Sequence, residues 1–119
     1  MAQIKIKRIY EEPERSDGYR VLIDRLWPRG LKKADAQLDE WNKTLPPSAE
    51  LRQWFNHEPE KFSQFEIDYR SELKHHPDEL NRLRAIAEKQ TLTLLYGAKD
   101  PKINQAVVLL AVLSTLKNK

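Results

Sequence analysis

Side chains that could bind a ligand or transfer a proton gather in two segments, which also hold all three glycines. The first is DGYRVLIDRLWPRGL (17–31) and the second is LLYGAKDPKIN (94–104). Each contains an apolar run that ends in a charged cluster with turn-forming residues. The candidate site residues are Asp24, Arg25, Trp27 and Arg29 in the first segment, and Tyr96, Lys99, Asp100 and Asn104 in the second.

Asp24 ends an apolar run and is the candidate catalytic residue. A carboxylate in that position costs free energy unless it has a partner, because burying an unpaired charge is strongly unfavourable. Asp24 could act as a general base or accept a hydrogen bond from a ligand hydroxyl. Its structural alternative is an acceptor for a loop backbone or an arginine.

The arginines of the first segment indicate an anionic ligand. Guanidinium groups make bidentate contacts with phosphate or carboxylate. Arg25 and Arg29 could serve in this way, or they could form ion pairs with Asp24 and Asp100. Trp27 lies between the two arginines and could stack on a base, or it could belong to the core.

The second segment leads into an apolar helix. The first backbone N–H groups of a helix lack partners and attract anions, so Lys99 stands where an anion could bind. Asp100 is a plausible helix cap and would compete for the same donors. Tyr96 and Asn104 are neutral polar candidates, and Asn104 could either orient a substrate or water or fix the 97–100 loop. The segment lacks the second glycine and the Gly-Lys-Ser/Thr ending of a P-loop.

The sequence lacks the residues that thiol chemistry, metal binding and serine hydrolysis require. The chain has no cysteine, which excludes disulfides, thiol nucleophiles and thiolate metal sites. His57, His75 and His76 have no metal-ligand spacing, and no GxSxG elbow is present. We therefore expect no metal and no cofactor.

The periodicity of apolar residues predicts the strands and helices that position these side chains. Alternation predicts a half-buried strand over 3–9, and two apolar runs predict interior strands over 19–26 and 91–96. Helical spacing predicts a short helix after the Ser48 N-cap, a longer helix through Phe62–Leu73 and a third through Leu80–Ala87. A last helix is predicted over about 101–117, with Pro101 at its first position. This order predicts one α/β domain over 1–119, a small Rossmann-like sandwich with a short, mainly parallel sheet and helices packed on its faces.

The long helical connection makes the strands at 19–26 and 91–96 parallel, whereas the strand at 3–9 could run either way. Ligands of open α/β sheets bind above the carboxyl ends of the strands. We therefore expect Asp24, Arg25, Lys99 and Asn104 to line one cleft.

Composition narrows the class of protein. The chain has 119 residues, which is room for one domain, and its net charge is +3 with 33% charged residues. Residues 1–33 hold nine Lys/Arg against five Asp/Glu, so the positive excess is N-terminal. The longest apolar run, 106–113, is too short for a membrane span, and the N-terminus has no signal-peptide core. We expect a cytoplasmic protein without a membrane partner, and the sequence leaves its oligomeric state open.

The two segments closely resemble the YeaO-like proteins, a bacterial group within domain-of-unknown-function family 488. The resemblance also takes in LDEW (38–41), LPPSAELRQWF (45–55) and LTLLYGAKDPKINQAVVL (92–109). It implies a compact Rossmann-like α/β domain, and so indicates fold and site more than reaction. Relatives often carry a histidine near the asparagine, where this chain has Ile103 and Gln105.

Together these features favour a domain that binds a phosphorylated or nucleotide-like anion at the strand ends. Hydrolytic or transfer chemistry through Asp24 is open. The alternatives are a nucleic-acid-binding module, for which the basic N-terminal third is the main support, and a non-catalytic interaction or scaffold domain.

Overall fold

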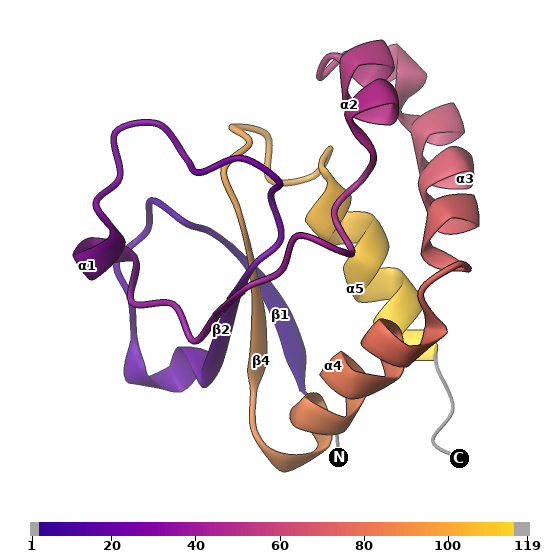
Figure 1. Cartoon of the computed structure of the whole chain (residues 1–119). Helices are drawn as coiled ribbons and strands as arrows, with labels where there is room; N and C mark the ends of the chain where they lie inside the picture. The colour runs from indigo at the N-terminus through magenta and orange to yellow at the C-terminus, as the bar shows by residue number, and fades with distance from the viewer. Residues whose placement is uncertain (1–2, 116–119) are drawn as a thin grey trace.

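The computed structural model describes residues 3–115 and has an α/β fold (Figure 1). The strands in this part of the chain are β1 (Ile4–Arg8), β2 (Tyr19–Leu22), β3 (Glu40–Trp41) and β4 (Leu92–Tyr96). The α-helices are α1 (Lys33–Ala36), α2 (Ala49–Phe55), α3 (Phe62–Leu73), α4 (Pro77–Lys89) and α5 (Gln105–Thr115). Two 3₁₀ turns span Arg15–Asp17 and Pro59–Lys61. The predicted α/β class is confirmed.

The four strands form one parallel sheet in the order β1-β4-β2-β3. The buried strand β4 lies between β1 and β2, so that Leu94 pairs with Ile6 on one side and Val21 on the other. The parallel pairing predicted for the second and last runs is confirmed, and the first strand has the same direction. The carboxyl ends of all four strands therefore meet at one edge of the sheet.

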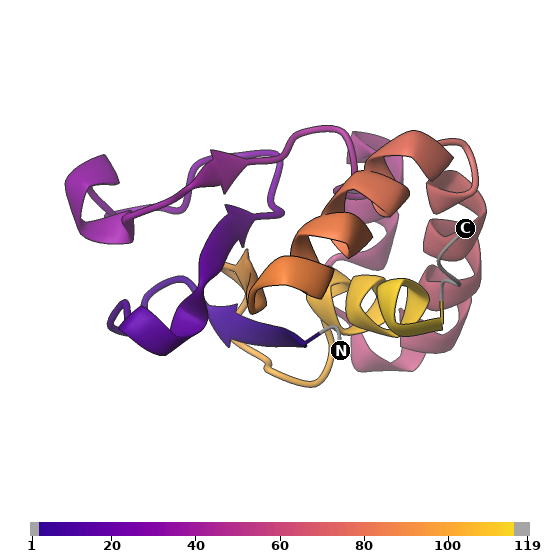
Figure 2. The same ribbon diagram turned by 90° about the horizontal axis from the view of Figure 1, so that it is seen from below.

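The longer helices lie on one side of the sheet (Figure 2). Helices α4 and α5 pack against its strands, and α3 packs on α5 with α2 beside it. Leu94 and Leu109 belong to this larger core. The opposite face is covered by the segment that carries the one-turn helix α1, over a smaller core around Leu22 and Leu95.

Strand β2 is shorter than predicted, because the run over 19–26 leaves the sheet after Leu22. The Ile23 N–H still bonds the Leu95 carbonyl at 3.0 Å, but the Asp24 side chain then takes the Gly97 N–H. A side chain that captures a backbone donor in this way competes with continued strand pairing. Leu26, the last residue of the predicted interior strand, is 68% exposed.

Helix α5 begins later than predicted. Pro101–Ile103 form a series of bends, and the carboxylate of Asp100 accepts the Lys102 N–H at 2.8 Å. The prediction that Asp100 caps the helix is wrong: Asn104 does so, since its Oδ1 accepts the Val107 N–H at 3.1 Å. Predicted helical positions 116–117 lie outside the described residues. Strand β3, of two residues, was too short to be predicted.

A buried ion cluster holds the amino ends of the strands. The carboxylate of Asp17 is fully buried and contacts the side chains of Lys5, Lys7 and Arg20. Burial alone would raise the pKa of Asp17, but the Glu14 N–H and the three cations hold that pKa well below its usual range. The cluster thus fixes this end of the sheet, away from the predicted site.

None of the helices in the described part of the chain is both long enough and apolar enough to span a membrane.

Candidate functional site

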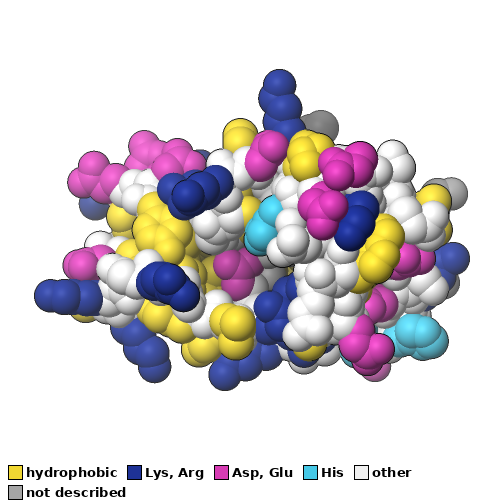
Figure 3. All heavy atoms as spheres, turned by 90° about the horizontal axis from the view of Figure 1, so that it is seen from above, with side chains coloured by type: hydrophobic (Ala, Val, Ile, Leu, Met, Phe, Trp, Pro, Cys, Tyr) yellow, Lys and Arg dark blue, Asp and Glu magenta, His cyan; other side chains and the backbone are white. Residues whose placement is uncertain are grey.

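A cavity of about 450 Å³ opens at the carboxyl edge of the sheet. Figure 3 looks onto this end and shows a hollow that contains an acidic side chain and has basic side chains and a histidine around it. Segments that follow all four strands contribute to the lining, together with α2 and its C-terminal turn. The main polar and charged lining residues are Asp24, Arg25, Arg29, Arg52, Gln53, Asn56, His57, Asn104 and Gln105. This is where parallel α/β sheets place their ligands.

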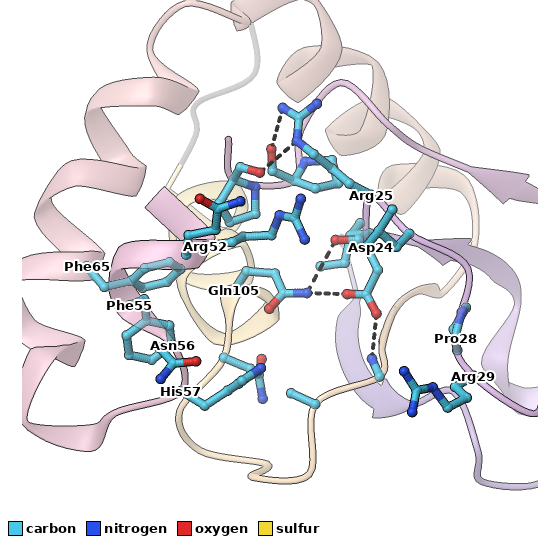
Figure 4. Close-up of a pocket in the computed structure, with 18 of the residues that line it drawn as sticks. Asp24, Arg25, Pro28, Arg29, Arg52, Phe55, Asn56, His57, Phe65 and Gln105 are labelled. Carbon is cyan, nitrogen blue, oxygen red and sulfur yellow. Dashed lines mark hydrogen bonds between the residues drawn. The ribbon is translucent and has the colours of Figure 1, made fainter. Parts of the chain in front are cut away.

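Asp24 is fixed in this cavity by three hydrogen bonds, of which Figure 4 shows the two to its side chain. Its carbonyl oxygen accepts the indole N–H of Trp41 at 2.7 Å, which holds the backbone beside β3. Its Oδ2 accepts the Gly97 N–H at 2.8 Å, and its Oδ1 accepts a hydrogen bond from the Gln105 amide. Because a Cβ at position 97 would lie 2.9 Å from Oδ2, glycine gives the carboxylate its room there.

Burial raises the pKa of Asp24 to about 6. The hydrogen bonds from Gly97 and Gln105 act in the opposite direction, as do the charges of Arg52 and His57, but they do not cancel the effect of burial. The carboxyl group therefore titrates close to neutral pH. Ionised, it can accept hydrogen bonds from a ligand, and each of its oxygens has an acceptor position beyond the one already used.

Arg25 has a structural role in this arrangement. Its guanidinium donates to the carbonyl oxygens of Pro46 at 3.0 Å and Pro47 at 2.7 Å. It thereby ties the segment after β2 to the segment before α2, and it forms none of the ion pairs among the described residues. The expected alternative in which it pairs with Asp24 is wrong.

Among the cations that line the cavity, Arg52 is the one with a buried donor that lacks a partner; the Nε of Arg84 shares this feature on α4, outside the cavity. Arg52 extends from α2 toward Asp24, and its Nε is buried without a hydrogen-bond partner in the structure (Figure 4). Arg29 lies on the other side of the cavity, on the segment after β2, and is exposed. A buried donor without a partner is costly, so the Arg52 guanidinium is arranged to donate a further hydrogen bond.

The local fold of α2 places two more residues at the rim. Ser48 caps the helix, since its Oγ accepts the Leu51 N–H at 3.1 Å. The helix ends in two consecutive left-handed residues, Asn56 with φ 47° and His57 with φ 55°. Left-handed backbone is uncommon outside glycine, and such strain concentrates at functional sites. Here it turns the chain so that both residues line the cavity.

The structure brings half of the predicted site residues together. Asp24, Arg25, Arg29 and Asn104 line the cavity. Asn104 is 1% exposed, and besides capping α5 it donates to the Asp100 carbonyl at 2.8 Å. These contacts match the structural alternative, in which Asn104 fixes the 97–100 loop.

The other four predicted residues do not line the cavity. Trp27 packs edge-on against Trp41, with ring centroids 5.2 Å apart, and donates to the Leu31 carbonyl. Tyr96 is buried in the larger core, and Lys99 and Asp100 are exposed. Of the four residues expected to share one cleft, Lys99 is thus the one outside its lining.

Sequence reasoning missed Arg52, His57 and Gln105 as site residues. Gln105 had a usable signal, because a polar residue at the start of an apolar helix needs a partner if it is buried. Arg52 and His57 had none, since their approach to Asp24 depends on how α2 packs and how its end turns. No group of three or more histidine, aspartate or glutamate side chains in residues 3–115 is arranged to hold a metal ion.

Comparison with known proteins identifies the family. The family described as the inactive DUF488-N3 subclade matches residues 3–119. Uncharacterized protein YeaO of Escherichia coli is 53% identical over 106 residues, covering 89% of this chain and 92% of that protein. Uncharacterized proteins of Mycobacterium bovis and Mycobacterium tuberculosis are each 36% identical over 112 residues, or 94% of both chains. No solved structure matches significantly. The resemblance to YeaO-like proteins is thus confirmed, and the chain belongs to the inactive DUF488-N3 subclade of the DUF488 family.

Proposed function

We propose that this domain binds a small phosphorylated or nucleotide-like anion in the cavity at the strand ends and holds it without converting it. The observation that carries the proposal is Arg52, whose side chain lines a cavity large enough for a ligand while its Nε has no hydrogen-bond partner. A guanidinium presents donors in a fork that matches the oxygens of phosphate or carboxylate.

The charges around the cavity support an anionic ligand. Arg29, Arg52 and His57 line it, and Asp24 is the one carboxylate among its described lining residues. Arg25 adds positive charge, but its Nε and one terminal nitrogen already donate to carbonyl oxygens and so are not free to bind a ligand. A cavity lined mainly by one sign of charge raises the local concentration of ligands of the opposite sign.

Binding is favoured over catalysis for a reason independent of geometry. The subclade to which the chain belongs is described as inactive. In this proposal the anion is bound by the cations of the cavity, and the hydrolytic or transfer role considered for Asp24 from the sequence is not needed.

Thermal unfolding with and without inorganic phosphate or pyrophosphate tests the proposal. A ligand at about one hundred times its Kd adds about 2.7 kcal/mol to the free energy of unfolding, or roughly 10 °C in Tm for a domain of this size. We expect such a rise for the wild type and its loss in Arg52→Gln.

Arg15→Gln is the matched control, because Arg15 is exposed at the other end of the sheet and the substitution removes the same charge. It should keep the full rise in Tm. An equal rise in all three proteins would mean that anions act on the surface in general, and no rise in the wild type would reject the proposal.

A further inference from the structure

The cavity is large enough for an organic ligand as well as for a simple anion. Its volume of about 450 Å³ lies in the range of roughly 300–1,000 Å³ that is typical of pockets for small organic ligands. Part of its wall is apolar and comes from Pro28, Pro46, Pro47 and Phe55. A ligand that fills it therefore has a carbon skeleton beside its charged group.

Asp24 determines which functional groups on the carbon skeleton the cavity can accommodate. Its carboxylate lines the same cavity as Arg52, and it is held there by Gly97 and Gln105 rather than by an arginine. An ionised carboxylate repels an anion placed against it, whereas it stabilises a hydroxyl or amino group that donates a hydrogen bond. The cavity thus offers a cation and a carboxylate acceptor to the same ligand.

We propose that Asp24 is a specificity-determining residue, which selects phosphate esters that carry free hydroxyl groups, such as sugar phosphates or nucleotides, over inorganic phosphate and over esters without hydroxyls. The inference rests on the proposed function, since the phosphate group is assigned to Arg52 and its neighbours. Gln105 acts through Asp24 as a positioning residue, because its amide donates to Oδ1 of the carboxylate and so orients it.

Three probes separate the parts of the ligand: inorganic phosphate, butyl phosphate and ribose 5-phosphate, each titrated calorimetrically into the full chain. We expect the wild type to bind ribose 5-phosphate at least about tenfold more tightly than butyl phosphate, the equivalent of one charge-assisted hydrogen bond. Asp24→Asn should reduce this preference to about threefold or less, while its affinity for inorganic phosphate stays within about twofold or increases.

A second variant guards against a folding defect in the first. Gly97→Ala keeps the aspartate but places a methyl group against its Oδ2, so the carboxylate has to move. We expect it to reduce the preference for ribose 5-phosphate in the same way. Circular dichroism and thermal unfolding of both variants establish that they fold.

The outcomes distinguish the two proposals. If the wild type binds inorganic phosphate but shows no preference for ribose 5-phosphate, or if both variants keep that preference, the role of Asp24 is rejected and the anion site stands. If the wild type binds none of the three probes, both proposals fail.

Discussion

At the scale of single residues, the fully buried Asp17 and the partly buried Asp24 are held in opposite ways. Asp17 is surrounded by three cations and a backbone donor, so its ionised form is stabilised. Asp24 has only neutral donors in direct contact, so burial favours its protonated form. A carboxyl group that gains nothing from ionisation in the folded state is a candidate for function, because structural ion pairs stabilise the charged form.

The pH dependence of stability should reveal this property of Asp24. Its pKa in the folded chain, about 6, is above the ordinary value of 3.8, so the folded state binds more protons than the unfolded state between these values. Stability from this group is full at low pH and is lost as the pH rises through about 6. We expect Asp24→Asn to gain stability relative to the wild type from about pH 4 to about pH 7, by on the order of 3 kcal/mol. Urea unfolding at a series of pH values measures the difference.

Asp35→Asn is the control, because Asp35 is exposed on α1 and its replacement should leave the pH profile unchanged. A variant at Asp24 that loses stability at neutral pH would instead assign this carboxylate to the fold.

Asp17→Asn should have the opposite effect. It leaves Arg20 buried without its counter-charge and Lys7 with only the exposed Glu14, and removal of one partner from a buried ion pair typically costs about 3–5 kcal/mol. Since the pKa of Asp17 is lowered, the stabilisation is full at neutral pH and is lost as the pH falls below about 4. Denaturant unfolding near neutral and at acid pH checks this: an equal loss at both pH values would contradict the assignment.

At the scale of elements, the site is assembled from short connections. The segments after β2 and β4 meet because their strands are parallel neighbours, and the hydrogen bond from Gly97 to Asp24 joins them. Helix α2 adds Arg52 and His57 although it is far from both strands in sequence. Its place is set by the cap at Ser48, by the contacts of Arg25 with Pro46 and Pro47, and by the left-handed turn at its end.

Alanine substitutions at Gly18, which directly precedes β2, and at Gly30, which serves as a comparison, test the turn before β2. Gly18 has φ +64°, and a Cβ there would lie 2.2 Å from the Thr91 carbonyl oxygen, which is fixed backbone. Gly30 has φ +77° with open space around it. We expect Gly30→Ala to cost about 1 kcal/mol from backbone strain, and Gly18→Ala to cost more than about 3 kcal/mol from strain and overlap together. Equal losses in thermal or urea unfolding would contradict this account of Gly18.

Sequence periodicity was enough to place the longer elements, because burial on a sheet or helix face leaves a repeating apolar pattern. It also brought Asp24, Arg25 and Asn104 to one edge through the parallel pairing of their strands. It failed where a side chain overrides the backbone pattern, as at Asp24 and Asn104. It could not find Arg52 or His57, because a cap, a loop contact and a backbone turn determine where these residues lie.

At the scale of the whole molecule, at least four of the nine Lys and Arg side chains in residues 1–33 are engaged within the fold. Lys7 and Arg20 are buried on Asp17, Lys5 also contacts that carboxylate, and Arg25 is bound to backbone carbonyls. Duplex binding depends on cations that are free to contact phosphates along a surface. The distribution therefore favours a small anion at the strand ends over nucleic acid as the ligand.

The central claim is that an anion binds in the cavity beside Arg52, and amide and guanidinium NMR shifts on titration with inorganic phosphate test it most directly. We expect the largest shifts at the guanidinium N–H groups of Arg52 and at the backbone N–H groups of His57, Gly97 and Gln105, with saturation and a single Kd. Arg52→Gln should abolish that saturable response. Shifts confined to exposed lysines, or a saturable response that persists in Arg52→Gln, would contradict the claim.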